Sequence, residues 1–365
     1  MSTLQSSEKL SPYHIVILVY MTQFGVIIFS LPQLLSKAFG TNGWVMNLIF
    51  AIIVIVNMLL IGAAYWMGKG KSIFVILERA MPRIMLYPLY LFLMFVWSVL
   101  GCLVAKEYVL IFQMIAFPTT HPMFFKIALD LLVFWLMIQG IYNISKSITM
   151  LFYLTIWMLP VVCFFYADFS WSRLTPFFFR EGQPSPVEFV NIFASYLGYE
   201  LILMVFPYTD KKSKLIKSSI IGSLLLAFIY TYLCIITFGF FSLRQLQRMA
   251  FPLLDLMAYI KFPFIERVEN LFFGAFLFTT VATVVMYLWS AQETALQVFK
   301  RANVKLVAGV LVIFAYVIAF IPDTLSDVQH WLGLFAQLEI GIAFILPLLL
   351  VVVLAFTKNK KEAAS

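Results

Sequence analysis

Long apolar runs recur from one end of the chain to the other, and they constrain the fold more than any other feature of the sequence. A helix needs about 20 apolar residues to cross a bilayer core, and run after run reaches this length. Hydrophobic residues make up 63% of the 365 residues, and charged residues only 12%. A soluble domain with this composition could not cover its surface with polar groups. The sequence therefore predicts an all-α polytopic membrane protein.

Ten membrane spans can be placed, and we expect them to form a single transmembrane domain over residues 1–365. Most of the 25 Lys and Arg residues fall in connections on the side of the N-terminus. Because cytoplasmic loops are rich in Lys and Arg, both termini are predicted to be cytoplasmic. The net charge of +8 then reflects attraction to an anionic inner leaflet, and we expect no nucleic-acid partner. The predicted spans are roughly 12–36, 43–68, 84–116, 123–143, 147–168, 190–209, 213–241, 267–297, 304–321 and 333–356.

The first and the sixth predicted spans each carry a glycine followed by a proline inside an apolar run. The first span contains FGVIIFSLP with Gly25 and Pro32, and the sixth contains YLGYELILMVFP with Gly198 and Pro207. One such pair alone fits an ordinary kink. A matched pair at the start of each half is typical of a five-plus-five inverted repeat, with repeats at about 12–168 and 190–356 and helices 1 and 6 broken.

Broken helices in a membrane expose backbone groups that can hold a ligand. Glycine tolerates an unwound backbone, and proline removes one hydrogen-bond donor. Freed amides can hold a carboxylate, and freed carbonyls can bind an amine or a cation. We therefore expect the two breaks to face each other and form the binding site.

Several charged residues lie inside the predicted spans, where each is costly unless it is paired or solvated. Lys106 and Glu107 are neighbours about 100° apart on a helix, so we expect Lys106 to pair with Glu200 or Asp130 on another helix. The alternative for these charges is a structural ion pair that fixes helix packing. The other intramembrane acids are Glu293 and Glu339.

Polar side chains in the third and eighth spans are further candidates. Thr283 and Tyr287 share one face of the eighth span, together with Thr279 or Thr280. Such threonines also bond their own backbone, which is the alternative interpretation. Trp97 and Ser98 in the third span are similarly ambiguous.

Metal, cofactor and enzyme sites are not indicated by the sequence. Cys102, Cys163 and Cys234 fall in separate apolar runs without a CxxC pair, so we expect buried packing cysteines. The three histidines are scattered, and neither HExxH nor GxSxG occurs. We therefore expect no metal, no cofactor and no enzymatic activity.

Two long outer connections are predicted, 169–189 before the sixth span and 242–266 after the seventh. The second contains PLLDLMAYI, which is too short to span a bilayer and is predicted to lie at or dip into the outer face. It is either a lid or a packed surface segment.

Several stretches resemble one family in the order in which they occur. They are FGVIIFSLP, RLTPFFFREG, LGYELILMVFP followed by a basic loop, FPLLDLMAYIKFPFIERVENLF and TTVATVVMYLW. This order resembles that of the B subunits of GerA-type spore germinant receptors, over essentially the whole chain. That family is related to the amino acid–polyamine–organocation transporters, which have the ten-helix fold of the bacterial leucine transporter.

The resemblance implies a sensor of a small nutrient, such as an amino acid, that triggers germination. It implies residence in the spore inner membrane beside a larger A subunit and a lipoprotein C subunit. Many relatives have a second glycine two residues after the first, where this chain has Ile27, whose side chain narrows the approach to the freed amides. The implied pocket residues are Gly25, Val26, Ile27, Trp97, Ser98, Leu197, Gly198, Glu200, Thr283 and Tyr287.

The main alternative is a proton- or sodium-coupled amino acid symporter, in which the intramembrane carboxylates relay protons. Against this alternative, the fifth predicted span of this chain, YLTIWMLPVVCFFY, has no lysine of the kind that replaces sodium in some proton-coupled relatives.

Overall fold

The protein is helical throughout the part that the computed structural model describes, which is residues 9–161, 165, 169–174, 177–260 and 268–362. Five of these helices are long and apolar enough to cross a membrane, and a bent pair over Pro186–Tyr208 forms a sixth candidate. The expected helical membrane architecture is therefore confirmed. The five are α3 (Met46–Met67), α5 (Arg83–Ala116), α11 (Leu215–Phe240), α14 (Val268–Val298) and α16 (Leu325–Glu362).

Shorter helices complete the bundle. Three of them have 15 or 16 residues, namely α6 (Pro122–Met137), α7 (Gly140–Thr155) and α15 (Val304–Ile318). A four-residue helix, α8 (Met158–Val161), follows α7. Since these lengths fall short of a full span, the count of ten spans stays a prediction. Cys163 and much of FIERVENLF lie outside the described residues, whereas Cys102 and Cys234 are buried free thiols.

The first apolar segment is interrupted in the middle. Helix α1 (Pro12–Gln23) ends before an extended stretch at Phe24 and Gly25, followed by the 3-10 turn η1 (Val26–Phe29) and α2 (Leu31–Phe39). Pro32 lies in the first turn of α2, where its missing N–H would have no intrahelical partner in any case. The proline therefore begins the second half of the segment.

The second interruption lies at Leu197 and Gly198. Before it come α9 (Pro186–Phe193) and η5 (Ala194–Tyr196), and the two sides of the break are bent by 51°. Gly198 has φ +112°, a conformation that L side chains rarely adopt. After the break the chain continues as η6 (Tyr199–Leu201), α10 (Ile202–Val205) and η7 (Phe206–Tyr208).

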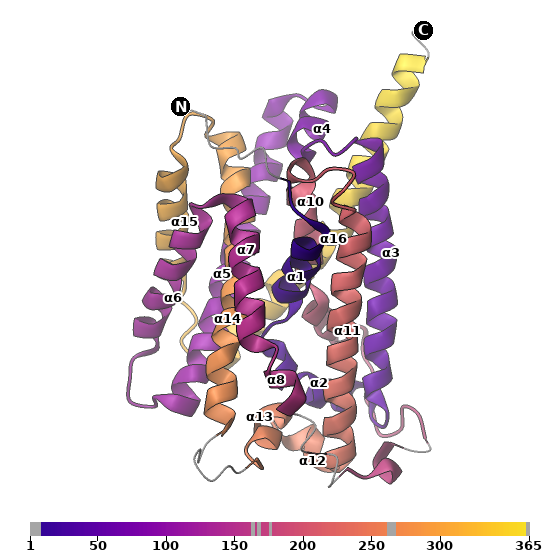
Figure 1. Ribbon diagram of the computed structural model, residues 1–365, viewed down its shortest axis with the longest axis vertical. Helices are drawn as coiled ribbons and strands as arrows, with labels where there is room; N and C mark the ends of the chain where they lie inside the picture. The colour runs from indigo at the N-terminus through magenta and orange to yellow at the C-terminus, as the bar shows by residue number, and fades with distance from the viewer. Residues whose placement is uncertain (1–8, 162–164, 166–168, 175–176, 261–267, 363–365) are drawn as a thin grey trace.

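The two interruptions touch each other at the centre of the bundle. A Cβ atom placed on Gly198 would lie 3.0 Å from the backbone oxygen of Thr22, at the end of α1. Helix α1 runs through the middle of the molecule and packs against α7, α11 and α14 (Figure 1). The most extensive helix pairing is between α5 and α14.

The two ends of the bundle carry different short elements (Figure 1). One end holds α4 (Ile73–Ala80) and the last turns of α16, and the other holds α12 (Leu243–Arg248) and α13 (Pro252–Met257). At the α4 end, Glu78 accepts hydrogen bonds from Arg83 and Lys300, each at 3.1 Å. These contacts tie α4 to the connection that follows α14.

The segment before the second interruption is fixed to the end of α2. The N–H of Phe179 donates to the oxygen of Thr41 at 2.8 Å, and the N–H of Thr41 donates to that of Arg180 at 2.9 Å. The N–H of Gln183 donates to the oxygen of Lys37 at 3.0 Å. The chain on either side of the two breaks is therefore joined twice, at the centre of the bundle and at the α12 end.

Replacing Gly198 with alanine should destabilise the protein by at least about 1–2 kcal/mol, because an L residue at positive φ is strained. Contact of the new methyl group with the Thr22 oxygen adds to this cost. Gly25→Ala is the matched control, since Gly25 has φ −107° and a Cβ there meets nothing within 4 Å. The thermal unfolding midpoint of each purified variant in detergent measures the difference. Equal midpoints for the two variants would contradict the assigned backbone geometry.

Candidate functional site

The carboxyl group of Glu200 caps the second helix break from within the chain. The N–H of Gly198 donates to both carboxyl oxygens, at 2.9 and 2.8 Å. The Tyr287 hydroxyl donates to Oε1 of the same group at 3.1 Å. A buried backbone N–H without a partner is costly inside a membrane, so this contact stabilises the break. The freed amide expected to hold a ligand carboxylate is therefore already occupied.

A second buried carboxyl, that of Glu339 in α16, lies against the first. The carboxyl groups of Glu200 and Glu339 lie within hydrogen-bonding reach of each other, and both residues are at most 2% exposed. The indole Nε1 of Trp97 donates to Oε1 of Glu339 at 2.9 Å. The structure thus brings together residues from η6, α5, α14 and α16 around two carboxyl groups.

The carbonyl groups freed at the end of α1 are also satisfied by side chains. The Thr283 hydroxyl donates to the Thr22 oxygen at 2.9 Å, and the Tyr230 hydroxyl donates to the Gln23 oxygen at 3.2 Å. The side-chain amide of Gln23 crosses to the second break and donates to the oxygen of Tyr196 at 2.6 Å. Since these carbonyls are taken, an amine or cation would have to displace a side chain to bind them.

Open space is found beside Gly25. A Cβ atom there would meet no heavy atom within 4 Å, and no side chain caps η1. Gly25 and Ile27 are partly exposed, whereas Val26 is buried. The first break therefore has room beside its glycine that the second break lacks.

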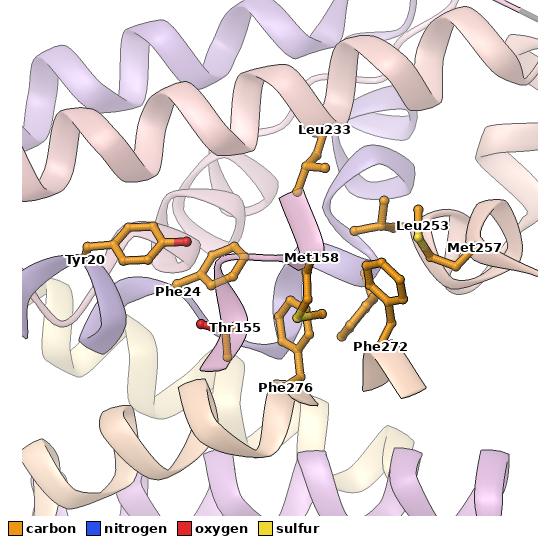
Figure 2. Close-up of a pocket in the computed structure, with 10 residues that line it drawn as sticks. Tyr20, Phe24, Thr155, Met158, Leu233, Leu253, Met257, Phe272 and Phe276 are labelled. Carbon is orange, nitrogen blue, oxygen red and sulfur yellow. The ribbon is translucent and has the colours of Figure 1, made fainter. Parts of the chain in front are cut away.

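An aromatic cavity of about 30 Å³ lies next to the first break (Figure 2). This volume is close to the share of a single water molecule in the liquid, so no amino acid fits inside it. Leu253 and Met257 of α13, in the segment predicted as a lid or a packed surface element, form part of its wall. The other wall residues include Tyr20, Phe24, Phe29 and Phe276.

The predicted pocket residues divide into two groups. Most lie at the two breaks or on the carboxyl pair, namely Gly25, Val26, Ile27, Trp97, Leu197, Gly198, Glu200, Thr283 and Tyr287. Ser98 does not contact the breaks in this way. Its hydroxyl donates to the Met94 oxygen at 2.7 Å, and it lines a separate apolar cavity of about 380 Å³ between α5, the end of α14 and α15.

The predicted pairing of Lys106 with Glu200 or Asp130 is wrong. Asp130 is bound by Lys126 at 2.6 and 2.5 Å, because residues four apart on a helix lie on the same face. The Lys106 ammonium lies 3.5 Å from the sulfur of Met123. Glu107 accepts a hydrogen bond from Gln329 Nε2 at 3.4 Å.

Several residues at the site were not assigned to it from the sequence. Glu339 was recognised only as a buried acid, and Gln23, Tyr230 and Lys126 were not singled out. Gln23 could have been found, because an amide side chain directly before a helix break needs a partner. Nothing in the sequence indicates that Glu339 faces Glu200, 139 residues away.

Comparison with solved structures identifies the class of fold. The chain matches the structure of Mhp1, a nucleobase-cation-symport-1 family transporter in a closed conformation with bromovinylhydantoin bound. The TM-score is 0.64 at 12% identity, and the match covers 90% of this chain and 75% of the transporter. The fold is therefore that of a membrane transporter.

Sequence comparison identifies the family. The family model described as spore germination protein matches residues 9–328, so the chain belongs to this family, which is not a family of enzymes. Spore germination protein GerQB of Bacillus cereus is 25% identical over 92% of each chain. Spore germination protein B2 of Bacillus subtilis is 23% identical over 83% of this chain and 80% of the relative. These matches confirm the family resemblance noted in the sequence.

Removing one partner of the buried Lys126–Asp130 pair should destabilise the protein by about 3–5 kcal/mol, because it leaves an isolated charge. The double variant Lys126→Met/Asp130→Leu should recover most of the stability that Asp130→Leu loses. Thermal unfolding midpoints of the two variants in detergent measure this. A double variant less stable than Asp130→Leu would contradict this, because it would show that unpaired Lys126 does not cause the loss.

Proposed function

We propose that this chain is the nutrient-sensing membrane subunit of a spore germination receptor. It binds a small ligand, such as an amino acid, at the breaks of helices 1 and 6 and so triggers germination. The observation that carries this proposal is the open space beside Gly25, at a backbone break in a chain of the spore germination protein family. On this proposal the protein resides in the spore inner membrane with a receptor A subunit and a lipoprotein C subunit.

Ligand entry requires a change of conformation on this account. The aromatic cavity beside the first break has a volume of about 30 Å³, and α13 forms part of its wall. In the open state α13 has moved away from the cavity, and the ligand binds only this state. Binding therefore shifts the equilibrium toward the open state, by an amount set by the difference in affinity of the ligand for the two states. Partner subunits then respond to the open state, and no net transport is needed.

Two side chains limit which chemical group of a ligand can bind the backbone at the breaks. Glu200 occupies the amide of Gly198, so a ligand carboxylate cannot use that amide without displacing a carboxyl group. Ile27 is partly exposed beside Gly25 and narrows the approach to the first break. The proposal therefore favours a small nutrient that enters beside Gly25 and leaves Glu200 in place.

The finer architecture belongs to the same proposal. Ten spans form a leucine-transporter-like repeat of five plus five, over about 12–168 and 190–356, with both termini on the inner side. Two features support it. The interruptions near the start of each half touch at Thr22 and Gly198, and basic residues Arg83 and Lys300 lie at the end of the molecule that holds α4.

A coupled amino acid symporter is the second candidate, favoured by the likeness of the fold to a cation symporter. Full-length protein in proteoliposomes should take up no labelled amino acid above the level of empty vesicles if the chain is only a sensor. Uptake that an uncoupler or removal of sodium abolishes would favour the symporter.

Filling the space beside Gly25 should strongly weaken the response to nutrient. Spores that carry Gly25→Trp should germinate at least about tenfold more slowly with the effective nutrient, equivalent to a loss of about 1.4 kcal/mol of binding free energy. That nutrient is found by screening spores with and without this protein. Gly309→Trp on α15 is the matched control, since a Cβ there meets only Phe134 at 3.8 Å. Normal germination of Gly25→Trp spores with every nutrient, at normal protein level, would refute the site.

A further inference from the structure

The carboxyl groups of Glu200 and Glu339 form a pair surrounded by hydrogen-bond donors. Glu200 receives the N–H of Gly198 and the hydroxyl of Tyr287, and Glu339 receives the indole N–H of Trp97. The two carboxyls lie within hydrogen-bonding reach of each other. One carboxyl group can donate to another only through a proton that it carries itself.

A buried carboxyl oxygen without a hydrogen-bond partner gives separate support for a proton between the two carboxyl groups. Oε2 of Glu339 is fully buried, and no N–H or O–H donor among the described residues reaches it. A buried polar atom without a partner calls for an explanation, and an unseen proton between the two carboxyl groups supplies one.

In the part of the chain that the structure describes, no positive charge compensates the pair. The groups that act on the two carboxyls there are each other, Trp97, the backbone and the hydroxyl groups of Tyr287 and Tyr199, and none of them is Lys, Arg or His. The buried ammonium groups of Lys106 and Lys126 contact Met123 and Asp130 instead. Two adjacent carboxylates in an apolar interior repel each other too strongly for both to ionise.

We propose that Glu200 and Glu339 together bind one exchangeable proton at the second break, at Leu197 and Gly198. The proton sits on one carboxyl oxygen and is donated to the other residue. When water reaches the pair, this O–H bond breaks, the proton leaves to water and both groups become carboxylates. Their repulsion then separates α16 from η6 and loosens the cap on Gly198. Protonation thereby controls the conformation of the break.

A proton suits this site better than a sodium ion. Hard cations are held by the lone pairs of several oxygen atoms. The groups that face Glu200 and Glu339 instead present N–H and O–H hydrogens, from Gly198, Tyr287 and Trp97. The inference does not depend on the proposed germinant site, because the proton binds without any nutrient.

Infrared spectroscopy of the purified full-length protein in lipid nanodiscs, without nutrient, tests the pair directly. The wild type should show the C=O band of a protonated buried carboxyl at neutral pH, and raising the pH should remove it reversibly. Glu200→Gln and Glu339→Gln should each lose this band, because the new amide donates to the remaining carboxylate. Glu78→Gln, at the surface ion pair, should keep it.

Trp97→Phe tests the same proposal if the glutamine variants fail to fold. It keeps both carboxyl groups and removes one donor to Glu339, so the band should persist at a shifted frequency. An absent band in the wild type, an unchanged band in Trp97→Phe or a band that persists in both glutamine variants would overturn the proposal. Loss of the band on adding sodium in place of choline at constant pH would also overturn it, in favour of a sodium site.

Discussion

The cap that Glu200 places on the amide of Gly198 is the contact on which the central architecture depends. A helix can be interrupted inside a membrane only if other groups bind the freed backbone atoms. Here a side chain two residues away does so, with both oxygens within 2.9 Å of the amide nitrogen. The cap places a carboxyl group in the middle of the bundle, where α14 and α16 must supply Tyr287 and Glu339 beside it.

The two breaks are connected by polar side chains, so neither can move alone. Gln23 joins the end of α1 to Tyr196, and Thr283 joins α14 to the same end of α1. A ligand that enters beside Gly25 therefore acts on the backbone of the first break and, through Gln23, on that of the second. This network of hydrogen bonds offers a physical link between a nutrient site and the carboxyl pair.

The sequence predicts the class of fold well and the contacts poorly. Apolar runs and the matched Gly and Pro residues locate both interruptions, because these signals are local in the chain. The partner of Lys106 was predicted wrongly, because Asp130 is bound by Lys126 of the same helix. A single sequence does not show whether a carboxylate pairs within its own helix or with a neighbouring helix. Ser98 follows Trp97 directly, yet adjacent helix positions point about 100° apart, and Ser98 lines another cavity. The pairing of Glu200 with Glu339 depends on tertiary packing alone.

The central claim is that a nutrient enters at the first break while Glu200 continues to cap the second. The sharpest test is a structure of this protein with the nutrient bound to which spores carrying it respond. We predict ligand density against Gly25, displacement of α13 and an intact contact between Glu200 and Gly198. Density confined to the apolar cavity beside Ser98, or a ligand carboxylate in the place of the Glu200 carboxyl, would contradict it.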